Sequence, residues 1–179
     1  MINDVHKILL DEEILAKRTK ELGQEISEDY AGQEILLVGI LKGASVFMAD
    51  LLRKITVPTC VDYMVVSSYG NSAQTSGAVR IIKDLEEDIE GKNVIVVEDI
   101  VDTGLTLNYL MKNLESRKPK SLKIASLLDK PARREKEIDI AYIGFEVPDE
   151  FIIGYGIDYA EKYRNLPFVG ILKREIYEK

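Results

Sequence analysis

Two adjacent carboxylates, Glu98 and Asp99, end an apolar run in the segment 93–107, NVIVVEDIVDTGLTL. The four residues before them, from Val94 to Val97, are all β-branched, which is typical of a strand buried on both faces of a parallel sheet. Ligands of open α/β sheets bind at the carboxyl ends of the strands. We therefore expect the two carboxylates to face a ligand at such a sheet edge.

A short loop rich in threonine and glycine follows the carboxylates. It consists of Asp102, Thr103, Gly104, Leu105 and Thr106, which offer hydroxyls and backbone N–H groups to an anion at the start of a helix. Neighbouring acids would repel a simple anion, but a sugar phosphate resolves the conflict. Its diol donates to the carboxylates, its phosphate occupies the loop, and a divalent cation screens the charges. A solvated strand end before an N-capped helix would use similar residues, but the complete pattern favours the ligand site.

The elements that must hold this site alternate along the chain. We expect helices over 11–31, 44–54 and 105–115 and strands over 35–40, 61–67, 79–82, 94–97, 122–128, 141–145, 151–153 and 168–172. This alternation predicts an α/β fold with a mostly parallel central sheet flanked by helices. Residues 68–78, SYGNSAQTSGA, have almost no apolar periodicity and are predicted to form a mobile loop.

Composition limits the class of protein. With 179 residues, of which 46% are hydrophobic, the chain is long enough for one domain and short for two. Its net charge of −7 argues against binding nucleic acid through a basic face. Cys60 is the only cysteine, which excludes an intrachain disulfide and a cysteine-rich metal site. We find no signal-peptide pattern and no run of about 18 apolar residues, so we expect no membrane span and a cytoplasmic location.

Three familiar catalytic or nucleotide-binding patterns are missing. The stretch from Gly154 begins like the dinucleotide-binding motif GxGxxG, but Tyr159 stands in place of the third glycine. The GxxxxGK[ST] pattern of P-loop kinases does not occur. His6 is the only histidine and is more easily read as incidental, which in practice excludes a histidine-based triad.

The segment VIVVEDIVDTGLTL resembles the phosphoribosyl-diphosphate binding motif of the type I phosphoribosyltransferases, in the form used by hypoxanthine-guanine phosphoribosyltransferases. Other stretches resemble that family in order and spacing: LKG at 41–43, SSYG at 67–70, LLDK at 127–130, VPDEF at 147–151, GYGIDY at 154–159 and RNLP at 164–167. The resemblance covers nearly the whole chain. It implies one type I phosphoribosyltransferase domain over 1–179, with a small hood subdomain from the N-terminal residues and about 148–179, and a flexible lid over about 68–78.

The resemblance divides the expected site residues into three groups. The ribose and 5′-phosphate group comprises Glu98, Asp99, Asp102, Thr103, Gly104, Leu105 and Thr106. The pyrophosphate group comprises Lys42, Gly43 and Arg164. The purine group comprises Ile100, Lys130, Phe151, Ile152 and Asp158. The resemblance also implies Mg²⁺, held by Glu98, Asp99 and Asp158.

Four of these residues have specific implied roles. The family's counterpart of Asp102 is the general base or acid for the proton on purine N7. Lys130 would reach O6 of the base; because an ammonium group can only donate hydrogen bonds, it suits a 6-oxo group and opposes the 6-amino group of adenine. Phe151 would stack on the purine, with Ile100 on the opposite face.

The resemblance carries three further expectations. A non-proline cis peptide bond should precede Lys42, as in the family. Ser68 and Tyr69 match the family's lid, whose closure would exclude water from the reacting centre. Glu150 departs from members that carry lysine at its position, which leaves the preference among 6-oxopurine bases open.

Taken together, these features predict a purine salvage transferase. It would join hypoxanthine or guanine to 5-phospho-α-D-ribosyl 1-diphosphate and release pyrophosphate. Two alternatives stay open: a phosphoribosyltransferase for another base such as xanthine or adenine, and an RNA-binding attenuation regulator built on the same fold. The family commonly forms homodimers or homotetramers, so we expect a homo-oligomer that binds small-molecule substrates.

Overall fold

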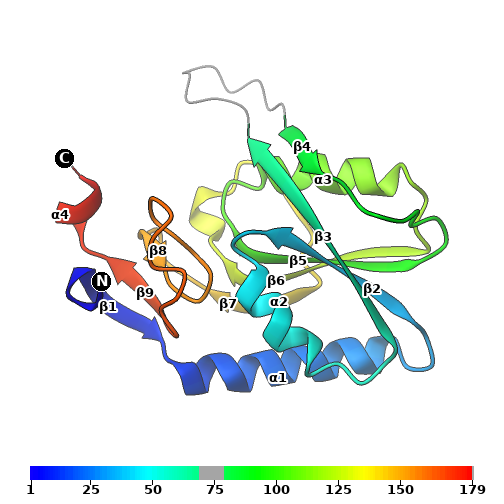
Figure 1. The fold of residues 1–179 in the computed structure, drawn as a ribbon, viewed down its shortest axis with the longest axis horizontal. Helices are drawn as coiled ribbons and strands as arrows, with labels where there is room; N and C mark the ends of the chain where they lie inside the picture. The colour runs from blue at the N-terminus through cyan, green and yellow to red at the C-terminus, as the bar shows by residue number, and fades with distance from the viewer. Residues whose placement is uncertain (69–78, 179) are drawn as a thin grey trace.

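The computed structural model describes residues 1–68 and 79–178 (Figure 1). In chain order the elements are η1 (Ile2–Asp4), β1 (Val5–Leu10), α1 (Glu12–Asp29), β2 (Ile35–Leu41), α2 (Ser45–Leu52), β3 (Thr59–Ser68), β4 (Val79–Lys83), β5 (Asn93–Val101), α3 (Leu105–Glu115), β6 (Ser121–Asp129), η2 (Pro131–Arg133), β7 (Tyr142–Glu146), β8 (Ile152–Ile153), β9 (Val169–Leu172) and α4 (Arg174–Tyr177). Among these residues, no helix is both long and apolar enough to cross a membrane.

The strands form two sheets, of which the larger has six strands in the order β4-β3-β2-β5-β6-β7. Its neighbouring strands run parallel except β3 and β4, which are antiparallel. β5 lies in the interior of this sheet, between β2 and β6. The predicted α/β fold with a mostly parallel sheet is therefore confirmed.

Helices cover both faces of the large sheet, with α1 and α2 on one face and α3 on the other (Figure 1). The side chains of Ile95 and Val97 in β5 pack into the core beneath α1 and α2. Those of Val94 and Val96 pack into the core beneath α3. The run of β-branched residues is thus buried on both faces, as its composition predicts.

The smaller sheet has three antiparallel strands in the order β1-β9-β8 and brings the two ends of the chain together (Figure 1). Val5 in β1 pairs with Leu172 in β9. Ile153, Phe168 and Leu172 belong to a separate small core of this region. This sheet corresponds to the hood that the fold class implies.

Most predicted boundaries agree with the structure to within two residues, but β5 is longer than its apolar run. Its pairing with β6 continues through Glu98, which lies opposite Ser126, to Val101. Backbone pairing does not require an apolar side chain, so the ladder extends past the valines. Glu98 and Asp99 therefore lie at the carboxyl end of the strand, as expected, but the strand itself continues beyond its expected end at Val97.

Two other differences concern strand ends and an edge strand. β1 was not predicted, because half of its residues are exposed and the segment lacks a clear alternation of apolar and polar side chains. Ser68, expected in the loop, is the last residue of β3 and pairs with Val79. Tyr69 and the rest of the predicted lid, up to residue 78, lie outside the described residues.

Candidate active site

The predicted phosphate loop joins β5 to α3 and surrounds a small cavity of about 160 Å³. Thr103, Gly104 and Thr106 line this cavity together with Glu98 and Asp102, while Leu105 begins α3. Gly104 adopts a left-handed backbone with φ of 80°, a conformation that glycine tolerates best. The loop thus places hydroxyls and the amino end of a helix around a space suited to a phosphate.

The two carboxylates of β5 lie in a crowded environment. Burial raises the pKa of Glu98 well above its usual value, and the charge of Asp99 adds to this effect. Burial also raises the pKa of Asp99, although the backbone N–H of Ile100, which donates to its Oδ1 at 2.8 Å, and the charge of Arg164 oppose the increase. Two carboxylates in this state are stabilised by hydroxyl donors or by a cation.

The end of β2 lies against these carboxylates. The peptide bond between Leu41 and Lys42 is cis, as the family resemblance implies. A Cβ atom added to Gly43 would overlap Oδ2 of Asp99, and one added to Gly156 would overlap the carbonyl oxygen of Gly43. The end of β2, the end of β5 and the segment around Gly156 therefore meet here, although they are far apart in the sequence. A glycine at each of the two contacts allows this close approach.

The two cations predicted to bind pyrophosphate are joined by one acidic side chain, Glu161. Its Oε2 lies 2.8 Å from Nζ of Lys42, and its Oε1 lies 3.3 Å from Nη2 of Arg164. Arg164 also pairs with Oδ1 of Asp158 at 2.8 Å and donates to the carbonyl oxygen of Gly156 at 2.8 Å. Lys42 holds the pKa of Glu161 below its usual value, so Glu161 is an anion at neutral pH.

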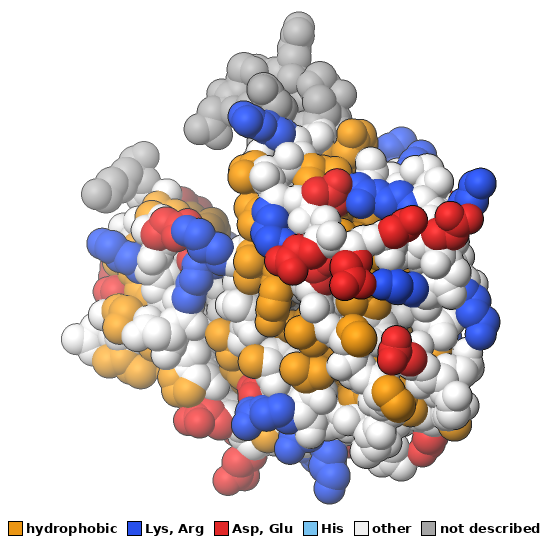
Figure 2. Space-filling model, turned by 45° about the vertical axis from the view of Figure 1, so that its right-hand side comes forward, with side chains coloured by type: hydrophobic (Ala, Val, Ile, Leu, Met, Phe, Trp, Pro, Cys, Tyr) orange, Lys and Arg blue, Asp and Glu red, His pale blue; other side chains and the backbone are white. Residues whose placement is uncertain are grey.

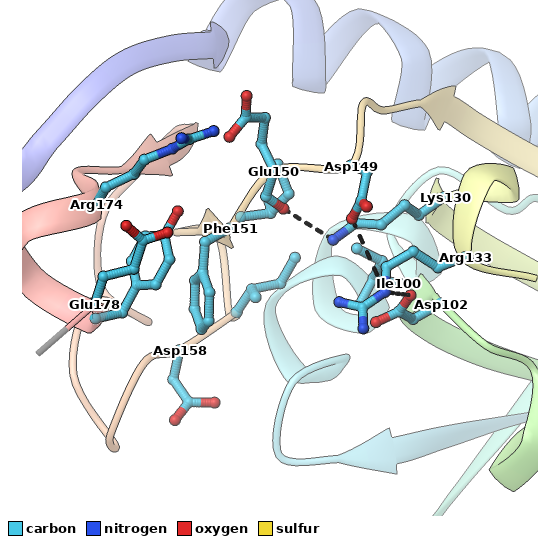
Figure 3. A pocket seen from close by; sticks show the side chains of 13 residues that line it. Ile100, Asp102, Lys130, Arg133, Asp149, Glu150, Phe151, Asp158, Arg174 and Glu178 are labelled. Carbon is cyan, nitrogen blue, oxygen red and sulfur yellow. Dashed lines mark hydrogen bonds and ion pairs between the residues drawn. The ribbon is translucent and has the colours of Figure 1, made fainter.

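A second cavity, of about 420 Å³, lies between the carboxyl edge of the large sheet and the small sheet (Figure 3). The structure brings the five residues of the predicted purine group, together with Asp102, into its lining: Ile100, Asp102, Lys130, Phe151, Ile152 and Asp158. Lys130 is only 6% exposed, and its Nζ donates to the carbonyl oxygen of Glu150 at 2.8 Å. A buried ammonium group therefore lines a pocket that also contains apolar and acidic side chains.

Aromatic rings gather around Phe151. Tyr177 from α4 stacks on Phe151 with ring centroids 4.8 Å apart, and Tyr159 meets it edge-on at 5.2 Å. Tyr177 and two charged residues of the C-terminal segment, Arg174 and Glu178, line the same cavity. These three residues were not predicted from the sequence, because nothing in their spacing connects them to the distant motifs.

Asp102, the expected proton acceptor, faces this cavity and approaches Arg133, a cation that was not predicted to belong to the site. Nε of Arg133 lies 3.6 Å from Oδ1 of Asp102 and 3.9 Å from Oδ1 of Asp149. The next residue, Arg134, instead donates to the backbone carbonyl oxygen of Asp102 at 3.1 Å and pairs with Asp129. Arg134 thus stabilises the backbone of the loop at Asp102, whereas Arg133 lies near the Asp102 carboxylate.

The predicted metal ligands provide the oxygen donors that Mg²⁺ prefers. Among the residues that the structure describes, no group of three or more His, Cys, Asp or Glu side chains is arranged to hold a metal ion by itself. Magnesium is commonly held by one or two carboxylates together with phosphate oxygens of a substrate. Glu98, Asp99 and Asp158 fit that kind of shared site, because Glu98 lines the small cavity, Asp158 lines the larger one, and the charge of Asp158 acts on Asp99.

This site lies on a mostly parallel sheet, where the interior strand β5 carries paired carboxylates near its carboxyl end and leads into the predicted phosphate loop, and a separate small sheet lies beside it. Such a combination defines the phosphoribosyltransferase class. The sequence matches the family described as "Phosphoribosyl transferase domain" over residues 6–160, and the chain belongs to this family. The family that the motifs predict is therefore confirmed.

Three relatives place the chain more narrowly. It is 51% identical to the hypoxanthine-guanine phosphoribosyltransferase of Bacillus subtilis, with 99% of both chains covered. A solved hypoxanthine phosphoribosyltransferase from Staphylococcus aureus superposes with a TM-score of 0.97 at 48% identity, covering 100% of this chain and 97% of that one. The bifunctional protein TilS/HprT of Listeria monocytogenes is 52% identical over 179 residues; this chain spans 28% of its length.

Proposed function

We propose that the chain transfers a 5-phosphoribosyl group from 5-phospho-α-D-ribosyl 1-diphosphate to hypoxanthine or guanine, giving IMP or GMP and pyrophosphate. One observation carries the proposal. The cavity between the two sheets has Lys130 and Asp102 in its lining, and Asp102 also lines the phosphate-sized cavity at the start of α3. A single nucleotide could thus place its phosphate in one cavity and its base in the other.

In this proposal the end of β5 and the loop after it hold the sugar phosphate. Backbone N–H groups and hydroxyls of Thr103, Gly104 and Thr106 donate to the 5′-phosphate. Glu98 and Asp99 accept hydrogen bonds from the two ribose hydroxyls, each of which contributes roughly 1.5–3 kcal/mol. Mg²⁺, when bound by these carboxylates and Asp158, supplies positive charge beside the diol and the pyrophosphate oxygens.

The leaving pyrophosphate is assigned to Lys42, Gly43 and Arg164. Lys42 and Arg164 both contact Glu161 in the structure, so an incoming pyrophosphate group replaces this carboxylate as their partner. Both side chains then lie beside the oxygen that takes the electron pair when the bond to C1′ breaks. Their charges stabilise the pyrophosphate as it leaves.

The base is assigned to the larger cavity. Lys130 donates to O6, and Phe151 and Ile100 contact the two faces of the ring. Asp102 accepts the proton of N7 while N9 forms its bond to C1′, so the charge on the purine stays low throughout the reaction. Each of these residues lines the cavity in which the base would bind.

The proposal is tested by incubating the purified chain with phosphoribosyl diphosphate, Mg²⁺ and each of hypoxanthine, guanine, xanthine and adenine. We expect rapid formation of IMP and GMP and at least about a thousandfold lower rate with adenine, since its 6-amino group cannot accept from Lys130. Equal rates with adenine would overturn the assignment of the base. No product with any base would overturn the transferase.

The alternative of an RNA-binding regulator receives no support from the net charge or from the face of the molecule drawn in Figure 2. On the face drawn in Figure 2, lysine and arginine side chains are interspersed with aspartate and glutamate side chains. The net charge of −7 also disfavours a phosphate backbone as the ligand. A binding assay with structured RNA at moderate salt should give no complex below micromolar concentration.

We also propose that the active form is a homodimer or homotetramer that acts in the cytoplasm. The support is the family resemblance alone. Light scattering on the purified chain should give the mass of two or four copies. The mass of a single copy at working concentration would contradict this part of the proposal.

A further inference from the structure

Three consecutive residues with left-handed backbones, Gly154, Tyr155 and Gly156, lie next to the proposed pyrophosphate site; we call them the GYG segment. Their φ angles are 95°, 49° and 100°. The backbone N–H of Tyr155 donates to the carbonyl oxygen of Leu166 at 2.9 Å, and that of Gly156 donates to the carbonyl oxygen of Arg164 at 2.9 Å. A left-handed backbone is uncommon for a tyrosine, so its surroundings must hold Tyr155 in this conformation.

Gly156 contacts both parts of the pyrophosphate site. It packs so closely on the loop between β2 and α2 that an added Cβ atom would overlap the carbonyl oxygen of Gly43. Its own carbonyl oxygen accepts from Nη1 of Arg164 at 2.8 Å. Nε of Arg164 is shielded from solvent and has no hydrogen-bond partner among residues 1–68 and 79–178. The direction of this guanidinium group therefore depends on where Gly156 lies.

The side chain of Tyr155 connects the GYG segment to α2. Tyr155 is only 7% exposed, and its hydroxyl donates to Oδ2 of Asp50, which lies 105 positions earlier in the chain. Burial and this hydrogen bond raise the pKa of the phenol, so the hydroxyl keeps its proton. The other oxygen of Asp50 pairs with Arg53. Because α2 begins shortly after Gly43, this contact joins the segment to the element that follows the pyrophosphate loop.

A third cavity, of about 400 Å³, lies beside this hydrogen bond. Residues of α1 and α2 and the segment 164–167 line it, and Asp50, Tyr155 and Arg164 are among them. Side chains next to a cavity lack packing partners on that side. The hydrogen bond from Tyr155 to Asp50 therefore restricts a movement that packing alone would leave open.

We propose that Tyr155 and Asp50 are positioning residues for the pyrophosphate site. By holding Gly156 in place, they fix the guanidinium group of Arg164 relative to the ammonium group of Lys42. This inference rests on the proposed function. Neither Tyr155 nor Asp50 lines the two cavities assigned to the nucleotide. Their effect is indirect, because charge-assisted hydrogen bonds to a pyrophosphate group weaken when one of the two cations is displaced.

The experiment measures the kinetics of Tyr155→Phe, which removes the hydroxyl and keeps the ring. The KM for phosphoribosyl diphosphate, and the KM for pyrophosphate in the reverse reaction, should each rise by about three- to tenfold, the effect of losing one buried hydrogen bond. GMP leaves the pyrophosphate site empty, so its Kd should stay within about twofold of the wild-type value.

Asp50→Ala removes the acceptor instead of the donor. It should raise the same two KM values by the same factor, and the double variant with Tyr155→Phe should show no further increase. Asp50→Ala also carries the test if Tyr155→Phe does not fold. Asp50→Asn keeps an oxygen that can accept from Tyr155, so its KM values should stay close to those of the wild type.

Tyr142→Phe is the matched control. The hydroxyl of Tyr142 donates to Oδ2 of Asp29 at 2.6 Å, so this variant also loses a hydrogen bond from a buried tyrosine to an aspartate. Neither residue lines the nucleotide cavities, and the KM for phosphoribosyl diphosphate should not change.

Three results would overturn the inference. The first is a KM for phosphoribosyl diphosphate in Tyr155→Phe that equals the wild-type value. The second is an equal rise in this KM and in the Kd for GMP, which would indicate a general loss of structure. The third is an equal rise in Tyr142→Phe or in Asp50→Asn. A wild type that makes no IMP would instead overturn the proposed function.

Discussion

The carboxylates proposed to hold the ribose lie on β5, an interior strand whose side chains are packed on both faces. The cavity proposed to hold the base is lined from four places: the end of β5, the segment after β6, the small sheet and α4. The sugar-phosphate half of the site is thus formed by one strand and the loop after it. The base half forms only when the two ends of the chain pair in the small sheet.

The two halves should therefore respond differently to substitution. The sugar-phosphate half is fixed by the central sheet, so substitutions there should change chemistry or substrate binding without changing the fold. The base half is assembled from separate segments, and several contacts in it are single ion pairs or stacked rings. Substitutions in the base half should therefore have graded effects, unless they remove the proton acceptor that both halves share.

The largest effect is expected at Asp102, which lines both cavities. Asp102→Asn keeps the shape but cannot accept the N7 proton. We expect kcat to fall by about 10²- to 10⁴-fold, while the Kd for GMP changes by less than about threefold. Steady-state kinetics and calorimetry on the same preparation would measure both. Unchanged turnover would remove Asp102 from acid-base catalysis.

The next largest effect is expected from Gly43→Ala, a substitution that tests the sugar-phosphate half. In Gly43→Ala the added Cβ would overlap Oδ2 of Asp99, so the carboxylate must move away from the ribose hydroxyls. Loss of such a charge-assisted hydrogen bond corresponds to roughly ten- to hundredfold in kcat/KM for phosphoribosyl diphosphate. Thermal unfolding serves as the control, and a Tm close to the wild type is expected. A kcat/KM within twofold of the wild type would argue that Asp99 does not hold the ribose.

Lys130→Met tests the base half with an intermediate effect. The wild-type ammonium already donates to the carbonyl oxygen of Glu150, so binding of O6 exchanges one partner for another. We therefore expect about a tenfold fall in kcat/KM for hypoxanthine, and the ratio of hypoxanthine to adenine activity should fall as well. Competition assays with the two bases would measure this ratio. An unchanged ratio would mean that Lys130 does not read O6.

Tyr177→Ala asks whether α4 contributes to the base half. Its ring stacks on Phe151, and such pairs contribute roughly 0.5–1.5 kcal/mol. The KM for hypoxanthine should rise by about two- to tenfold, with the KM for phosphoribosyl diphosphate unchanged. Tyr177→Phe is the matched variant and should behave like the wild type. Equal KM values for hypoxanthine in the wild type and both variants would mean that α4 does not contribute to binding of the base.

The smallest effect is expected at Glu161, which pairs with Lys42 and Arg164 where pyrophosphate is proposed to bind. Glu161 and Lys42 are about two-thirds exposed, so the pair is weak. Glu161→Gln should lower the KM for phosphoribosyl diphosphate by about two- to threefold, because less competition remains for the two cations. An increase in this KM would mean that Glu161 orders the cations for the ligand rather than competing with it.

Most of the sugar-phosphate half could be predicted from the sequence. Consecutive β-branched residues identify a strand buried on both faces, and the acids and the glycine loop after it indicate what the strand end binds. The same local signals placed the helices and most strands. They missed the length of β5, because backbone pairing continues through Glu98 and Asp99 regardless of their charge.

The pyrophosphate and base parts of the site were harder, because their contacts join residues that are far apart in the chain. Lys42 and Glu161 are separated by 119 positions, and no local pattern links an exposed glutamate to a distant lysine. Arg133 follows Lys130 closely, but its meeting with Asp102 depends on how β5 and β6 lie side by side. Such contacts follow from the completed fold, whereas the family resemblance supplied Lys130 and Phe151 in advance.

The most direct test of the proposed site is a crystal structure of the chain with GMP. The phosphate should lie against Thr103, Gly104 and Thr106, and the ribose hydroxyls should donate to Glu98 and Asp99. The guanine O6 should accept from Nζ of Lys130, with N7 facing Asp102. A nucleotide whose phosphate lies away from the start of α3, or whose base lies outside the cavity between the two sheets, would contradict the site proposed for both halves.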